Sequence, residues 1–287
     1  MIGAPARMTP SPPTMPIPVF VVSLARAAER RRLICEHLAA LGISYRLVDA
    51  VDGAKLSPSE RDRYLPADSS MHAGAIGCYL SHIHIYEVMR DEQIPVALVL
   101  EDDARLSPRA VDLVQAEAAA FHFDYCFLDS DDHNDQGPIY YDKANAVAAP
   151  GGFRAHALSA GPQTTHAYLI TLPAAQRRLS AAFPILRAID LYDHLPYRID
   201  FRAIVSPKLA WVSEHSLISF TSERNDDAQA LSFAALRRSP AFYRLRDWLK
   251  LKNWRRSRAI RSLVRAGRLS AGGRWAPLPS GREVIFK

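Results

Sequence analysis

Short apolar runs alternate along this chain with longer stretches whose apolar residues recur at helical spacing. The run Pro18–Leu24 predicts a buried strand, and Ala25–Gly42 predicts an amphipathic helix that stops at its terminal glycine. Ser44–Gly53 predicts a second strand followed by a turn at Asp52-Gly53. A strand, a helix and a strand in this order predict a βαβ unit with two parallel strands.

The same alternation continues to about residue 183. Ser57–Leu65 predicts a short helix, with Ser57 as its N-cap and Glu60 completing a capping box. The later predicted elements are the helix Ala73–Gln93, the strand Val96–Leu100, the helix Pro108–Phe121, the strand Phe123–Asp135, the strand Thr165–Thr171 and the helix Leu172–Phe183. Gln136–Pro162 has no clear period, so no element is assigned there. The alternation predicts an α/β fold with a mostly parallel central sheet flanked by helices.

The composition changes this picture little. A hydrophobic content of 48% and a charged content of 23% are typical of a globular protein and exclude a disordered chain. Three widely spaced cysteines make neither a disulfide framework nor a zinc motif, which agrees with a reducing compartment. No apolar run is long enough for a transmembrane helix. The proline-rich residues 1–16 lack the apolar core of a signal peptide and predict a flexible leader.

The charge is distributed unevenly. Residues 237–268 carry twelve Arg or Lys and one Asp, a net +11, so the rest of the chain is −5 within a total of +6. Tryptophans and aliphatic residues lie between these charges, which favours a partly helical tail on an anionic membrane surface. The alternatives are a nucleic-acid-binding segment, for which no recognised motif is present, and a solvated basic helix that packs on the acidic body.

Candidate chemistry begins where the strand Val96–Leu100 ends in Glu101, Asp102 and Asp103. In α/β sheets, ligands bind beyond the carboxyl ends of the strands. Adjacent carboxylates suit hard divalent cations such as Mn²⁺ or Mg²⁺. On extended backbone, Glu101 and Asp103 point to one side and Asp102 to the other. The alternative is a set of solvated loop charges or helix caps.

Three segments then resemble glycosyltransferase family 25. They are "FVVSLARAAERRRLICEHLAALGISYRLVDAVDG", "GAIGCYLSHIHIYEVMRDEQIPVALVLEDDA" and "AYLITLPAAQRRL" followed by "DLYDHLPYRI". The resemblance spans roughly Val19–Thr221. It implies a GT-A nucleotide-sugar fold, a UDP-hexose donor that is often UDP-galactose, a metal at the Glu-Asp-Asp motif, and inversion at the anomeric carbon. One departure is Ala75, where the family usually carries an acidic residue.

The resemblance also implies roles for individual residues. The candidates for nucleotide-sugar binding are Ser23, Leu24, Arg30, Asp49, Asp52, Gly74, Gly77 and Glu101, the last facing the ribose. The candidate metal ligands are Asp102, Asp103 and a late histidine, His215. Asp193 is the first candidate for the general base that an inverting transfer needs, and Asp190 is the second. A second acidic cluster makes Asp129 and Asp131 a rival metal site. His82 receives no catalytic role, and for every candidate a capping, packing or salt-bridge role is the structural alternative.

The resemblance therefore implies a metal-dependent, inverting hexosyltransferase of lipopolysaccharide or other surface-glycan assembly. Its expected partners are a UDP-hexose, an oligosaccharide or lipid-linked saccharide acceptor and an anionic membrane surface, without nucleic acid. The expected location is cytoplasmic and peripheral on the inner face of the membrane. The expected division is a leader at 1–16, a catalytic domain at 17–225 and a basic tail at 226–287. The rival hypotheses are a receiver-like signalling domain and a basic-tail nucleic-acid-binding protein.

Overall fold

The structure is a computed structural model that describes residues 16–67, 69–128, 139–158, 164–192, 195–196 and 198–213, with three short strands further on. The strands are β1 (Val19–Ser23), β2 (Arg46–Asp49), β3 (Val96–Glu101), β4 (Ala104–Leu106), β5 (Tyr125–Phe127), β6 (Ile139–Ala149), β7 (Phe153–Leu158), β8 (Ala167–Thr171), β9 (Phe201–Ala203), β10 (Ala210–Val212), β11 (Ser270–Gly272), β12 (Arg274–Pro277) and β13 (Glu283–Phe286). The α-helices are α1 (Ala28–Ala40), α2 (Pro58–Tyr64), α3 (Ala73–Asp91), α4 (Val111–Val114) and α5 (Leu172–Ser180).

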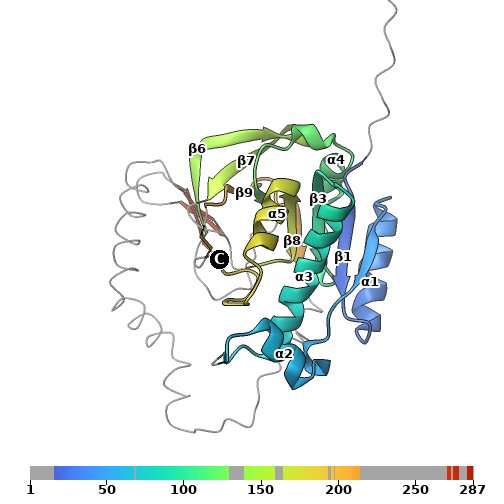
Figure 1. Ribbon diagram of the computed structural model, residues 1–287. Helices are drawn as coiled ribbons and strands as arrows, with labels where there is room; N and C mark the ends of the chain where they lie inside the picture. Colours follow the sequence, from blue (N-terminus) through green and yellow to red (C-terminus); the bar gives the residue numbers. More distant parts are fainter. Residues whose placement is uncertain are drawn as a thin grey trace, which may run out of the picture.

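Strands β1 and β3 are buried on both of their faces. Alternate residues of β3 contribute to two separate cores: Leu98 and Leu100 pack in one, and Ala97 and Val99 pack in the other. Residues of α1 and α4 complete the first core, and residues of α3 and α5 complete the second. The continuous apolar runs in the sequence therefore mark a sheet covered by helices on both sides, as Figure 1 shows.

The α/β class is confirmed, and the sheet itself is mixed. Its strand order is β11-β6-β7-β9-β5-β8-β3-β1-β2. Among the strand pairs of this sheet that the structure describes, β1–β2, β1–β3 and β5–β9 are parallel and five others are antiparallel. The expectation of mostly parallel strands therefore holds for the β2–β1–β3 segment, where the predicted βαβ unit is found. It does not hold beyond β3, because β8 runs antiparallel to both of its neighbours.

Two local predictions were wrong. The helix expected at Pro108–Phe121 is broken into short turns around α4. The carbonyl of Val114, which a longer helix needs for its next turn, accepts the amide of Ile17 at 2.9 Å instead. Gln136–Pro162, where the sequence predicted no element, contains the β6–β7 hairpin. The pairing register of this hairpin shifts between Asp142 and Ala146. This shift interrupts the period-two pattern by which a strand is recognised in a sequence.

The turn after β2 is packed tightly against the start of α3. A methyl group at Gly77 would lie 2.3 Å from the carbonyl oxygen of Val51, so only glycine fits there. Ser81, one helical turn later, accepts the amide of Val51 at 2.9 Å and donates to the Gly77 carbonyl. The glycine-rich start of α3 thus fixes the Asp52-Gly53 turn at the edge where β1, β2 and β3 end.

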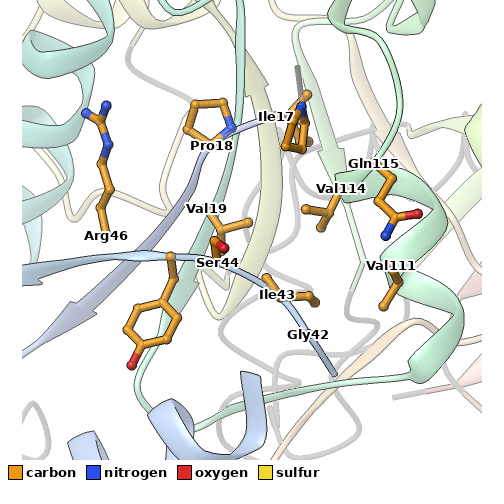
Figure 2. A pocket seen from close by; sticks show the side chains of 12 residues that line it. Ile17, Pro18, Val19, Gly42, Ile43, Ser44, Arg46, Val111, Val114 and Gln115 are labelled. Carbon is orange, nitrogen blue, oxygen red and sulfur yellow. The ribbon is translucent and has the colours of Figure 1, made fainter. Parts of the chain in front are cut away.

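A pocket of about 310 Å³ lies at the opposite end of the sheet. Figure 2 shows its lining, which includes Val19 at the first position of β1, Gly42 and Ile43 after α1, and Val114 of α4. The acidic triplet begins at Glu101, the last residue of β3, so the pocket and the triplet lie at opposite ends of parallel strands. Among the described helices, none combines the length and the apolar character needed to cross a bilayer.

Candidate active site

The acidic triplet does not alternate as extended backbone would, because Asp102 and Asp103 form the turn between β3 and β4 and both contact Arg30. Asp102 faces β1 and α1: Ser23 Oγ donates to Asp102 Oδ2 at 2.7 Å, and Arg30 Nη2 forms an ion pair with Oδ1. Carboxylate oxygens of Glu101 and Asp103 lie near the imidazole of His166. Asp103 also contacts Arg30 through Oδ2, so it lies between the Arg30 side and the His166 side of the site.

Arg30 is the cation that makes this burial possible. Its Nη2 contacts Asp102 and also Asp103 Oδ2, the latter at 2.9 Å. The side chains of Asp102 and Asp103 are only 8% and 5% exposed, and that of Arg30 is 15% exposed. Burial raises the pKa of Asp102, while the Arg30 charge and the Ser23 hydroxyl act in the opposite direction. Both oxygens of Asp102 are therefore engaged by protein groups.

On the other side, Glu101, Asp103 and His166 form a set of metal-donor atoms. One ligand atom from each residue lies within 4.8 Å of the others, and His166 Nε2 is 3.9 Å from Asp103 Oδ1. The side chains of Glu101 and His166 are 22% and 19% exposed, so the set opens to solvent. Two carboxylates and one imidazole fit a divalent cation, and the nitrogen ligand suits Mn²⁺ better than Mg²⁺.

His166 is the member that sequence reasoning missed. It precedes β8, and the amide of Glu101 donates to the His166 carbonyl at 3.0 Å where β3 and β8 pair. The antiparallel pairing thus places the first residues of β8 beside the last residue of β3. No sequence motif marks His166, because its role depends on which strand lies next to β3.

Glu101 stays ionised despite its surroundings. Desolvation by burial disfavours its charge, but the nearby imidazoles of His82 and His166 and the Thr165 hydroxyl outweigh that effect and lower its pKa. Thr165 Oγ1 donates to Glu101 Oε1, and His82 Nε2 lies 3.8 Å from the same oxygen. At that separation the histidine contact is electrostatic rather than a hydrogen bond. The geometry therefore favours a carboxylate at this position.

Asp190 is the other acid that the structure brings to this site. Burial and the charge of Glu101 raise its pKa, whereas His82 and His166 lower it, so all three lie within electrostatic reach of Asp190. Its backbone is held from α5: Arg178 Nη2 donates to the carbonyl of Ile189 at 3.1 Å, one residue earlier. A half-buried carboxyl group with a raised pKa is the property expected of a general base or acid.

The remaining predicted residues line the same edge of the sheet. Leu24 follows Ser23 at the end of β1 and accepts the amide of Ala27 through its carbonyl. Asp49 at the end of β2 accepts from Arg31 at 2.7 Å, and the same guanidinium donates to the Ser23 carbonyl. Asp52 caps the turn at Gly53–Lys55 and pairs with Arg26.

The glycines of α3 have different positions with respect to this edge. Gly74 lies in the first turn of α3. Gly77 packs closely against the turn that follows β2, as described above. Four candidates lie outside the described residues: Asp193, His215, Asp129 and Asp131. The basic segment 237–268 lies outside them as well.

The sequence of this chain is similar to those of known glycosyltransferases. The model of "Glycosyltransferase family 25 (LPS biosynthesis protein)" matches residues 16–192. The inactive glycosyltransferase 25 family member 3 of Homo sapiens is 30% identical over 240 residues, covering 75% of this chain and 38% of that protein. Procollagen galactosyltransferase 1-A of Xenopus laevis is 27% identical over 222 residues, covering 71% of this chain and 34% of that protein. This chain thus spans about a third of the length of these curated relatives.

One solved structure is also similar in part. It is a glycosyltransferase involved in glycosylation of the major capsid of PBCV-1, with 9% sequence identity and a TM-score of 0.34. The match covers 69% of this chain and 92% of that one.

The Arg30 ion cluster generates a stability prediction. Arg30→Met keeps most of the apolar stem but leaves two buried carboxylates without their cation, so we expect a loss of about 3 kcal/mol or more at pH 7. Without Arg30 these carboxyls have folded-state pKa values above the unfolded value near 3.9, so the loss shrinks as the pH falls towards that value. Urea unfolding at several pH values measures this.

The matched control is Arg32→Met on the same helix. The ion pairs of Arg32 with Glu29 and Glu36 are exposed, so its replacement should change stability little. Equal effects of the two substitutions would contradict the structural role of Arg30.

Proposed function

We propose that this chain, which belongs to glycosyltransferase family 25, is a metal-dependent hexosyltransferase that moves a hexose from a UDP-sugar to a saccharide acceptor with inversion. The observation that supports it most is the donor set of Glu101, Asp103 and His166 at the carboxyl end of β3. It lies in the segment that the family model matches, and at the edge of the sheet where α/β proteins bind ligands. Membership of this family argues against a receiver-like signalling domain.

Within this proposal, Glu101, Asp103 and His166 hold Mn²⁺, and Asp102 is an anchor rather than a ligand. Both oxygens of Asp102 are already engaged, by Ser23 and by Arg30. The cation supplies positive charge where the diphosphate of a nucleotide-sugar leaves. The family resemblance implies that Glu101 faces the ribose, but its position beside His166 favours a metal-binding role.

The protein's own groups supply the remaining chemistry. Asp190 takes the proton from the acceptor hydroxyl, because its raised pKa brings it closer to neutral pH than an exposed aspartate. Arg31 ties the ends of β1 and β2 together, which holds the nucleotide-facing edge in place. Asp193, the first choice from the sequence, remains a candidate for the same role.

The identities of the donor sugar and the acceptor are proposed from the names of relatives and from the description of the family. One relative is named a galactosyltransferase and the family description refers to LPS biosynthesis, which supports UDP-galactose and a surface glycan. Other relatives are named inactive, so turnover is the first property to measure. We also propose that the enzyme is cytoplasmic and binds the inner face of the membrane through its basic segment.

The metal and donor proposal is tested by binding and turnover. We expect Mn²⁺ to bind the purified protein and to be required for UDP-galactose hydrolysis or transfer within a panel of UDP-sugars. Asp103→Asn should weaken Mn²⁺ binding by roughly tenfold or more while the fold is retained. Paramagnetic resonance of Mn²⁺ measures the binding, and circular dichroism checks the fold. Full turnover of the variant in excess EDTA would disprove the metal role.

The general-base proposal predicts a selective loss of turnover. Asp190→Asn should lower kcat about 100-fold or more and change the affinity for the UDP-sugar little, since a base acts in the transition state. Because the base must be ionised, the wild-type rate should rise with pH through a pKa above that of an ordinary aspartate. Asp91→Asn, at the exposed end of α3, is the control. Normal turnover of Asp190→Asn would move the role to Asp193.

The membrane proposal predicts binding that depends on residues 237–268. Each Lys or Arg near an anionic leaflet contributes about 1 kcal/mol at most, and salt screens that attraction. Removing residues 237–287 should release the protein from phosphatidylglycerol vesicles in co-sedimentation at low salt. Transfer to a short soluble acceptor should persist. Equal vesicle binding by both forms, or unfolding of the shortened chain, would show that the segment has another role.

A further inference from the structure

A chain of buried hydroxyl groups leads to the carboxylate of Glu101. Tyr125 donates to the hydroxyl oxygen of Tyr86 at 3.3 Å, and the hydroxyls of Tyr86 and Tyr168 lie 2.8 Å apart. The Tyr168 hydroxyl lies 2.7 Å from Nδ1 of His82. All four side chains are at most 1% exposed. Burial also raises the pKa of Tyr86 and Tyr168, so both hydroxyls keep their protons.

The direction of each hydrogen bond in this chain follows from the one before it. A buried hydroxyl proton needs an acceptor, so Tyr86, which accepts from Tyr125, is assigned as the donor to Tyr168. By the same requirement Tyr168 is assigned as the donor to Nδ1 of His82. A neutral imidazole that accepts at Nδ1 carries its proton on Nε2. The tyrosines therefore select one tautomer of His82.

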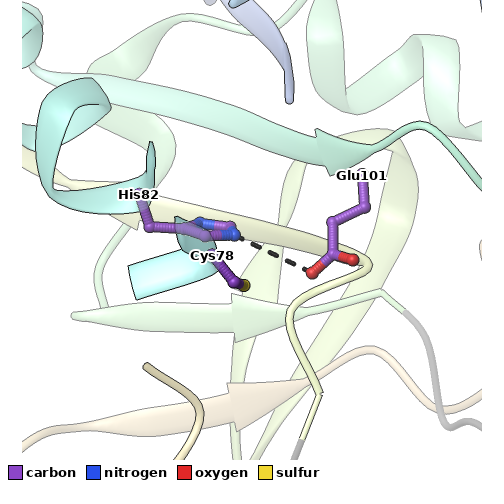
Figure 3. Close-up of side chains that lie close together, drawn as sticks. All are labelled: Cys78, His82 and Glu101. Carbon is purple, nitrogen blue, oxygen red and sulfur yellow. Dashed lines mark ion pairs between the residues drawn. The ribbon is translucent and has the colours of Figure 1, made fainter. Parts of the chain in front are cut away.

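The protonated Nε2 faces the candidate active site. It has no hydrogen-bond partner among the described residues and lies 3.8 Å from Glu101 Oε1, the contact drawn in Figure 3. Thr165 donates to the same oxygen. Two donors thus converge on Oε1, and within the described part of the chain Oε2 is the oxygen that no protein donor occupies.

A rival use of His82 is a second metal site. Cys78, His82 and Glu101 place one potential ligand atom each within 4.8 Å of the others. Figure 3 shows the three side chains. A metal there requires a bare Nε2 and a thiolate. The tyrosine chain places a proton on Nε2, and burial together with the nearby carboxylates raises the pKa of the Cys78 thiol well above its ordinary value. The cluster therefore does not favour a metal.

We propose that His82 is a positioning residue, held as its Nε2–H tautomer by Tyr168, which orients Glu101 so that Oε2 points to the bound cation. This inference rests on the proposed function for the role of Glu101 as a ligand. The tautomer of His82 does not rest on it. Groups that orient a metal ligand commonly change metal affinity 10–100-fold when they are removed.

Two substitutions of His82 distinguish the roles of its two ring nitrogens. In His82→Gln the amide nitrogen reaches roughly the place of Nε2 and keeps a donor towards Glu101. In His82→Asn the amide reaches only the place of Nδ1, so it keeps the contact with Tyr168 and removes that donor. We expect Mn²⁺ affinity to fall about tenfold or more in His82→Asn and less than about threefold in His82→Gln. His84→Gln, exposed on the same helix, is the control and should match wild type.

The tautomer is read directly by ¹⁵N NMR of histidine-labelled protein at neutral pH. In the wild type, the His82 signals should show a bare Nδ1 and a protonated Nε2, and Tyr168→Phe should reduce that preference. A protonated Nδ1 in the wild type, or equal Mn²⁺ affinities of His82→Asn and His82→Gln, overturns the proposal. The NMR measurement needs neither metal nor substrate. If wild type binds no Mn²⁺, the proposed metal site fails while the tautomer is still decided.

Discussion

The fold depends on placing three carboxylates at the end of a fully buried strand. Burying charge is costly unless each group is paired, and β3 delivers Asp102 and Asp103 into surroundings with almost no solvent. A single guanidinium from α1 contacts both, and a hydroxyl from β1 satisfies the remaining oxygen of Asp102. This requirement fixes where α1 begins and how β1 ends relative to β3. The site and the parallel core are therefore one structural unit.

The three carboxylates of the triplet have different contacts. Both oxygens of Asp102 are engaged, by Ser23 and by Arg30. Asp103 contacts Arg30 through Oδ2 and lies 3.9 Å from His166 through Oδ1. The turn at Asp102 and Asp103, rather than the alternation of β3, sets these positions.

The start of α3 is similarly divided. Gly77 and Ser81 secure the Asp52-Gly53 turn through packing and hydrogen bonding. His82 faces Glu101 and connects it to the tyrosine chain inside the second core. Residues that lie together in one short motif therefore support two different parts of the candidate site.

The sequence alone determined the elements whose signals are local. Continuous apolar runs identified β1 and β3, helical spacing identified α1 and α3, and Ser57 with Glu60 identified the capping box of α2. The alternation expected for Asp102 and Asp103 did not hold, because the chain turns at these two residues. The tertiary structure decided which distant groups meet. The antiparallel pairing of β8 with β3 placed His166 beside Glu101, and the docking of α1 placed Arg30 between two carboxylates. No local pattern encodes such contacts, because they depend on the order of strands in the sheet and on the docking of helices against it.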